Sequence, residues 1–122
     1  MGRIIHFDLE AQDPDRAMRF YTDVFNWQFE KWDGPLEYWL IKTGPEEEPG
    51  IDGGMSRTEG DKPETTNTIA VENLDMVLER LRLSGGHIVR EKSAIPGVGW
   101  IAYCTDTEGN YFGVIENDAE AK

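Results

Sequence analysis

The feature that most constrains the fold is an internal repeat in the order of the expected elements. Residues 3–10 alternate in polarity as a strand does, and "DPDRAMRFYTDVF" after them carries apolar residues at helical spacing. Three strand-like segments follow, and beyond the polar stretch 58–66 the order of one strand, one helix and three strands starts again. A repeat of about 60 residues therefore predicts two copies of a βαβββ unit.

Two such copies are expected to join, because a half of this size cannot bury one face of a small sheet alone. We expect an α+β fold in which one curved mixed sheet carries helices on its outside and a groove along its inner face. The chain of 122 residues fits a single domain, residues 1–122. Within it, module 1 spans about 3–57, a linker about 58–66 and module 2 about 67–117.

Both expected helices have start signals. Asp13 followed by Pro14 is typical of an N-cap with proline at the first helical position, and Asn73 is expected to cap the second helix. The first helix should pack through an apolar stripe, because side chains at helical spacing share one face. The residues of that stripe are Ala17, Phe20, Tyr21, Val24 and Phe25.

Two glycines hold matching positions in the repeat. Aligning "GIDGGMSR" with "GNYFGVIE" matches Gly54 with Gly113, and the first strands then match His6 with Thr68. A glycine inside a strand gives up a side chain and weakens the strand, so each of them needs a reason. We interpret Gly54, Ala70 and Gly113 as small residues that leave volume in the floor of the groove.

The net charge of the chain limits the classes of partner that it is expected to bind. It has 24 acidic residues against 12 basic ones, a formal net charge of -12. Nucleic acids and anionic membranes bind clustered Lys and Arg, so neither is expected as a partner. The single cysteine excludes an internal disulfide, and no segment approaches the roughly 20 apolar residues of a membrane-spanning helix. We therefore expect a soluble, cytoplasmic protein.

The sequence resembles the vicinal oxygen chelate superfamily, which includes glyoxalase I, extradiol dioxygenases and bleomycin-resistance proteins. The resemblance covers nearly the whole chain and lies in "HFDLEAQDPDRAMRFYTDVFNW" and "AIPGVGWIAYCTDTEGNYFGVIE". The segments "GPLEYWLIKTG", "GGM" and "AIPGVG" are similar to a bacterial and archaeal branch described only as glyoxalase-related. That branch implies no defined reaction. The superfamily also implies a homodimer, which is common among its two-module chains.

Metal-using members of this superfamily bind a divalent ion through four inward positions, and the ion chelates two neighbouring oxygens of the substrate. The corresponding positions in this chain are His6, Gly54, Thr68 and Gly113. Only His6 can ligate well, because glycine has no side chain and threonine is a poor neutral ligand. We therefore expect no metal and no other cofactor. The alternative is one divalent ion held by His6 with Asp8 and Asp52, which lie two residues from mapped positions.

Without a metal, the inner face is still expected to form a small-molecule site, since pockets combine aromatic and small residues with a few polar groups. Its expected ligand-binding residues are His6, Thr68, Ala70, Gly54, Trp39, Trp100, Tyr111 and Gly113, with Tyr38 also at its walls. The loop "SAIPGVGW" is expected either to close over a ligand or to form an ordinary turn. Glu116 falls on the other face, at a strand end, and is expected to be solvated.

Three classes of function stay open. The favoured one is a binding protein for a small aromatic or amphipathic molecule, without a metal. The second is an enzyme, a lyase, isomerase or dioxygenase, that uses either a divalent ion or His6 with Asp8 as general base, a role that suits histidine. The third is a protein-interaction module.

Overall fold

The computed structural model describes residues 2–122. It has two compact units, one formed by His6–Thr66 and the other by Asn67–Lys122 together with the residues up to Ile5. The order of elements is strand, helix and three strands, twice. The α+β class and the two βαβββ modules that the repeat predicts are therefore confirmed. No helix among residues 2–122 is long and apolar enough to cross a bilayer.

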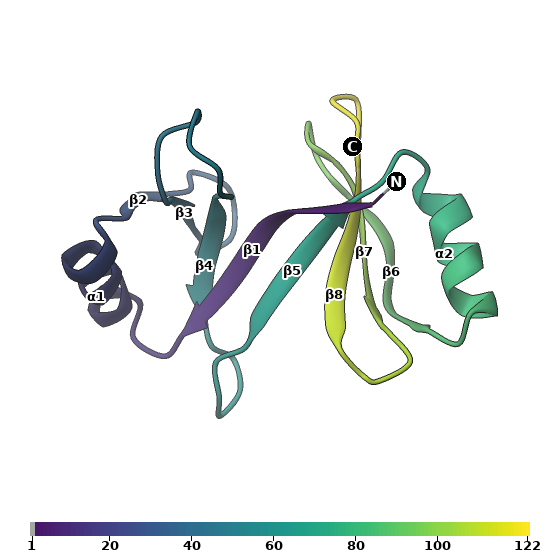
Figure 1. The fold of residues 1–122 in the computed structure, drawn as a ribbon, viewed down its shortest axis with the longest axis horizontal. Coiled ribbons are helices and arrows are strands. Elements are labelled where there is room, and N and C mark those ends of the chain that lie inside the picture. Colours follow the sequence, from purple (N-terminus) through teal and green to yellow (C-terminus); the bar gives the residue numbers. More distant parts are fainter. Residues whose placement is uncertain (1) are drawn as a thin grey trace. The chain divides into compact units, whose positions relative to one another are not determined.

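The first module places one helix against four strands (Figure 1). Its elements are β1 (Arg3–Ala11), α1 (Pro14–Phe25), β2 (Gln28–Lys31), β3 (Trp39–Lys42) and β4 (Gly53–Arg57). The strands lie in the order β2-β3-β4-β1, with β3 antiparallel to both neighbours and β4 parallel to β1. Side chains of α1 pack on the buried residues Ala11, Ile41 and Met55.

Helix α1 begins as its sequence predicts, with the Asp13 side chain accepting a hydrogen bond from the Arg16 amide at 3.1 Å. The stripe that faces the sheet is different from the expected one. Pro14 is buried in the first turn, so the positions three and four residues later, Ala17 and Met18, face the core. The other half of the expected stripe is left exposed: Phe20 (55%), Val24 (56%) and Phe25 (56%).

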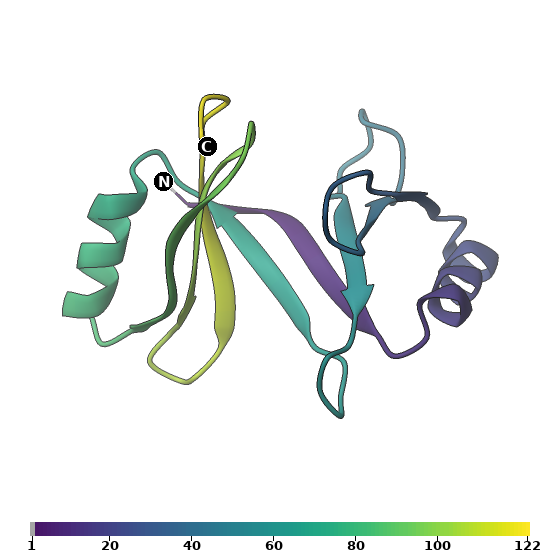
Figure 2. The ribbon, with the colours of Figure 1, turned by 180° about the vertical axis from the view of Figure 1, so that it is seen from behind.

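The second module repeats this arrangement (Figure 2). Its elements are β5 (Thr65–Ala70), α2 (Leu74–Leu83), β6 (His87–Ile95), β7 (Gly99–Thr105) and β8 (Tyr111–Asn117). The strands lie in the order β5-β8-β7-β6, and β5 is parallel to β8 as β1 is to β4. Helix α2 covers the face that carries the buried residues Ala102, Cys104 and Val114. Burial raises the pKa of the Cys104 thiol, with a smaller contribution from the charge of Glu91.

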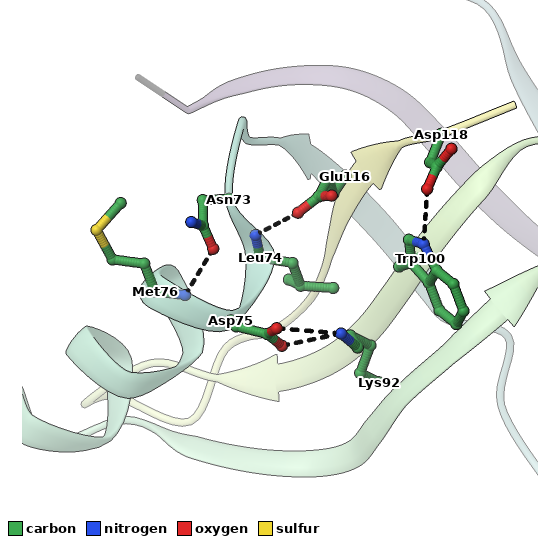
Figure 3. Close-up of polar contacts among 8 residues, drawn as sticks. All are labelled: Asn73, Leu74, Asp75, Met76, Lys92, Trp100, Glu116 and Asp118. Carbon is green, nitrogen blue, oxygen red and sulfur yellow. Dashed lines mark hydrogen bonds and ion pairs between the residues drawn. The ribbon is translucent and has the colours of Figure 1, made fainter. Parts of the chain in front are cut away.

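Two side chains cap the start of α2 (Figure 3). Asn73 accepts a hydrogen bond from the Met76 amide at 3.0 Å, and Glu116 accepts one from the Leu74 amide at 2.8 Å. The first amides of a helix have no partner inside it, so both bonds satisfy donors that would otherwise be free. The expectation that Glu116 is solvated is therefore wrong, because the end of β8 lies beside the start of α2.

The glycine-rich loop between β6 and β7 is a tight turn. Ile95 pairs with Gly99, so only three residues connect the strands. Gly97 has a φ of 76°, a left-handed conformation that glycine adopts without strain. The segment is therefore a turn between strands, and its closure over a ligand stays a prediction.

Candidate functional site

A cluster of three polar side chains lies in the first module. The Tyr38 hydroxyl donates a hydrogen bond to Asp8 Oδ1 at 2.5 Å, and His6 Nε2 lies 3.0 Å from the same hydroxyl. His6 Nε2 is also 3.3 Å from Asp8 Oδ1. The side chains of His6 and Asp8 are 34% and 28% exposed, so solvent reaches the cluster only in part.

Strand geometry explains why these groups meet. His6 and Asp8 share the face of β1 opposite to Phe7, which packs in the core under α1. Asp8 pairs directly with Gly54 on β4. A Cβ atom built on Gly54 would overlap the Tyr38 hydroxyl, so the glycine leaves the room that this hydroxyl occupies.

Gly113 has a similar environment in the second module. It pairs with Thr68 on one side and with Tyr103 on the other. A Cβ atom built on it would lie 3.1 Å from Thr68 Oγ1 and 3.2 Å from Tyr103 Cε1. The ring of Tyr103 is stacked on Tyr111, with 5.7 Å between centroids. The expectation that Gly54 and Gly113 leave open volume is therefore wrong, because a tyrosine fills the space at each.

The strand register also corrects the internal match of the repeat. In the first module the residue opposite Gly54 is Asp8, and in the second the residue opposite Gly113 is Thr68. Asp8 is therefore the counterpart of Thr68, and the expected match of His6 with Thr68 is wrong by two residues. An even shift keeps every side chain on its expected face.

The helix caps support this corrected register. Asp13 and Asn73 follow their matched strand residues at the same interval along the chain. Thr66 is then the counterpart of His6, and its hydroxyl is as poor a metal ligand as that of Thr68. Thr68 and Gly113 share their face with Ala70 and Tyr111, as the alternation of the strands predicts.

The two tryptophans expected in the site lie on the opposite faces of their sheets. Trp39 pairs with Met55 and packs on the core under α1, and Lys31 Nζ lies 5.8 Å from its ring centroid. Trp100 packs on the core under α2, and its Nε1 donates a hydrogen bond to Asp118 at 3.1 Å (Figure 3). Their expected place at the walls of the groove is wrong, because alternation along β3 and β7 turns them toward the helices.

A hollow of about 430 Å³ adjoins the polar cluster. Its walls come from β2 and β3 and from the residues just before Gly54, and His6 belongs both to the hollow and to the cluster. Asp52 is held there by the Thr43 amide, which donates to it at 2.9 Å. The side chains that give the hollow its character are His6, Gln28, Glu30, Leu40, Lys42 and Asp52.

The residues of this site do not fit a chelated metal ion. Within residues 2–122, no three His, Cys, Asp or Glu side chains come together as a metal site requires. His6 and Asp8 touch, but the third group is a phenol, and Gly54 supplies no side chain. The alternative site with Asp52 is not assembled either, although Asp52 lines the same hollow as His6.

Tyr38 is the residue whose role sequence reasoning missed, since it was expected only as part of a wall. It lies 32 residues after His6 and 30 after Asp8, so no local pattern connects it with them. The alternation of β3 does contain a signal. Tyr38 precedes Trp39 and so shares the face of Leu40, which pairs with Gly54.

Known proteins resemble this chain in sequence and in fold. The family model described as Glyoxalase/Bleomycin resistance protein/Dioxygenase superfamily matches residues 3–114. A probable lactoylglutathione lyase of Vibrio parahaemolyticus is 26% identical over 126 residues, which cover 95% of this chain and 91% of that protein.

Solved structures share the fold. Methylmalonyl-CoA epimerase from Mycobacterium tuberculosis has a TM-score of 0.70 at 17% identity, over 94% of this chain and 87% of its own. A hypothetical protein from Bacillus halodurans has a TM-score of 0.72 at 11% identity, over 99% and 98%. These structures show the fold. The family model matches most of the chain, and the chain therefore belongs to the Glyoxalase/Bleomycin resistance protein/Dioxygenase superfamily.

Proposed function

We propose that this protein binds a small molecule in the hollow of the first module, beside the cluster of His6, Asp8 and Tyr38, and that it does so without a chelated metal. The observation that carries the proposal is the position of His6, whose side chain lines the hollow and contacts both other members of the cluster. A ligand in the hollow would therefore meet an imidazole already oriented by a phenol and a carboxylate.

The size and lining of the hollow support this proposal. Its volume of about 430 Å³ lies within the range of about 300–1,000 Å³ typical of small-molecule sites. Leu40 offers apolar surface, while Lys42 and Glu30 supply charges of both signs. A lining of this kind offers partners to polar and charged groups of either sign.

Ligand-observed NMR with a library of small polar and aromatic compounds tests the proposal. Compounds that bind the wild type should lose most of their affinity on His6→Ala and keep it on His87→Ala. His87 is the other histidine of the chain and begins β6 in the second module, so it is a matched control. Equal binding to both variants would remove His6 from the site.

Metal analysis tests the second half of the proposal. Protein purified without chelators should carry no stoichiometric divalent metal, and treatment with EDTA should leave the affinity for a hit compound unchanged. A stoichiometric ion that is lost together with binding would contradict the metal-free site.

A second candidate function is metal-free proton transfer by His6. It is favoured by the contact of His6 with the Tyr38 hydroxyl, which bonds to a carboxylate and can stabilise a charged imidazole. The names lyase and epimerase among the similar proteins suggest two compounds for the assay, S-lactoylglutathione and methylmalonyl-CoA. Deuterium incorporation from D₂O, present in the wild type and in His87→Ala but lost in His6→Ala, would support it. No incorporation with either compound would count against these substrates.

The homodimer and the cytoplasmic location stay predictions, as does the protein-interaction alternative. Sedimentation equilibrium checks the first of them. A species of twice 13.9 kDa is the expected result.

A further inference from the structure

We propose that Tyr38 is a positioning residue that holds neutral His6 in one tautomer, with its proton on Nε2. The other ring nitrogen, Nδ1, is then the atom that accepts a hydrogen bond from a ligand. This inference rests on the proposed function, since it concerns the same site. The tautomer itself is measured without any ligand.

The direction of the first hydrogen bond sets the others. A phenol hydroxyl has one proton to donate. That proton goes to Asp8 Oδ1, at 2.5 Å, and a carboxylate is a stronger acceptor than a neutral imidazole. Toward His6 the Tyr38 oxygen therefore offers a lone pair, and Nε2, at 3.0 Å, must be the donor.

The second contact of His6 leads to the same assignment. Nε2 lies 3.3 Å from Asp8 Oδ1, and a carboxylate oxygen accepts hydrogen bonds but does not donate them. Both groups that face Nε2 are thus acceptors. In a neutral imidazole only one nitrogen carries a proton, so the lone pair is on Nδ1.

Tyr38 is held in this position from two sides. The ring of Trp32 meets the ring of Tyr38 edge to face, with 6.0 Å between centroids, and the Trp32 amide donates to the Tyr38 carbonyl at 2.8 Å. At the other end, Gly54 leaves the space for the hydroxyl. A glycine at position 54 is therefore a condition for the contact of Tyr38 with His6, because any side chain there would displace the phenol.

The inference narrows the class of ligand. A site that presents Nδ1 as an acceptor favours a molecule with an O–H or N–H group over one that carries only acceptors. Among the hits of an NMR screen, hydroxyl- or amide-bearing compounds should bind more tightly than their O-methyl or N-methyl analogues.

The test is a long-range ¹H–¹⁵N correlation spectrum of ligand-free protein labelled with ¹⁵N-histidine, recorded at a pH where the imidazoles are neutral. Wild-type His6 should show the pattern of the Nε2–H tautomer, and exposed His87 serves as the reference within the same spectrum. In Tyr38→Phe the Nε2 proton loses its nearer acceptor, and its exchange with solvent should accelerate about tenfold. An Nδ1–H pattern in the wild type, or an unchanged exchange rate in Y38F, would overturn the proposal.

Variants of the two glycines provide an independent test of the role of Tyr38. Gly54→Ala should displace the Tyr38 hydroxyl and reproduce the spectrum of Y38F, whereas Gly113→Ala, the same change at the matched position, should keep the wild-type His6 signals. An unchanged His6 in G54A contradicts the role of Tyr38. These spectra contain no ligand, so a ligand screen without hits would weaken the proposed function and leave the tautomer result standing.

Discussion

In the first module the tyrosine over the central glycine comes from the segment before β3, and in the second it comes from β7, directly opposite the glycine. Tyr38 places its hydroxyl over Gly54, whereas Tyr103 places its ring edge beside Gly113. This difference determines which group occupies the space next to each glycine. In the first module the Tyr38 hydroxyl contacts a carboxylate and an imidazole. In the second module the Tyr103 ring stacks on Tyr111.

The strand beside each glycine also carries different side chains in the two modules. The first module carries His6 and Asp8, and the matched residues of the second are Thr66 and Thr68. Imidazole and carboxylate groups can accept or transfer protons near neutral pH, and threonine cannot. The side chains able to move a proton therefore lie in the first module, where the proposed site is.

The largest effect on stability is expected at the buried residue that follows each of the two glycines. Met55→Ala should lower the free energy of unfolding by about 2–5 kcal/mol, because the side chain is fully buried and leaves a cavity. Val114→Ala, at the matched position, should cost about 2 kcal/mol, because a smaller volume of side chain is lost than in Met55→Ala. Urea denaturation of both variants measures the difference. Losses below about 1 kcal/mol would show that these residues are not the centres of their modules.

The next largest effect is a difference in stability between alanine substitutions at the two glycines. Gly54→Ala should cost about 1–3 kcal/mol, since the new methyl group overlaps the Tyr38 hydroxyl. Gly113→Ala should cost about 1 kcal/mol or less, because its neighbours at 3.1 and 3.2 Å need to move only slightly. In a Tyr38→Ala background the cost of Gly54→Ala should largely vanish, which a double-mutant cycle tests. An undiminished cost there would mean that another neighbour, not Tyr38, requires the glycine.

The helix starts offer a smaller contrast. Asp13→Ala should destabilise by about 1 kcal/mol, and Asn73→Ala by a similar amount. Helix α2 has a second cap, so Glu116→Ala should add a further loss of about 1 kcal/mol to that of Asn73→Ala. Thermal unfolding compares these variants with Glu72→Ala, an exposed control. No effect of Glu116→Ala would mean that water replaces its bond to the Leu74 amide.

The smallest effect is expected in the stability of the protein at low pH. The Asn110 side chain, together with backbone amides of its turn, lowers the pKa of Asp106 below its ordinary value of 3.8, and Arg57 lowers that of Glu37 below 4.5. A carboxylate whose pKa is lowered by folding stabilises the protein fully at a pH above its ordinary pKa. This stability is lost as the pH falls through the lowered pKa of the folded state. Unfolding measured between pH 5 and pH 2 should therefore depend less on pH in Asp106→Asn and Glu37→Gln than in the wild type. A steeper dependence in either variant would contradict this sign.

Local signals predicted much of the fold. Asp13 with Pro14, and Asn73, locate the helix starts because caps and proline act within one turn. Period-two alternation placed His6 with Asp8, and Gly113 with Tyr111, on their faces. The expected places of Trp39 and Trp100 are wrong because they rest on residue type and not on alternation, and aromatic side chains suit a pocket and a core equally well.

The sequence by itself determined the order of elements, the repeat, the two matched glycines and the shared face of His6 and Asp8. These follow from spacing along the chain, which the backbone geometry of helices and strands converts directly into position. Only the tertiary structure decided that Tyr38 occupies the space over Gly54 and joins the other two residues. That contact depends on the pairing of β3 with β4 and on the rotamer of one side chain, and neither is encoded in local spacing.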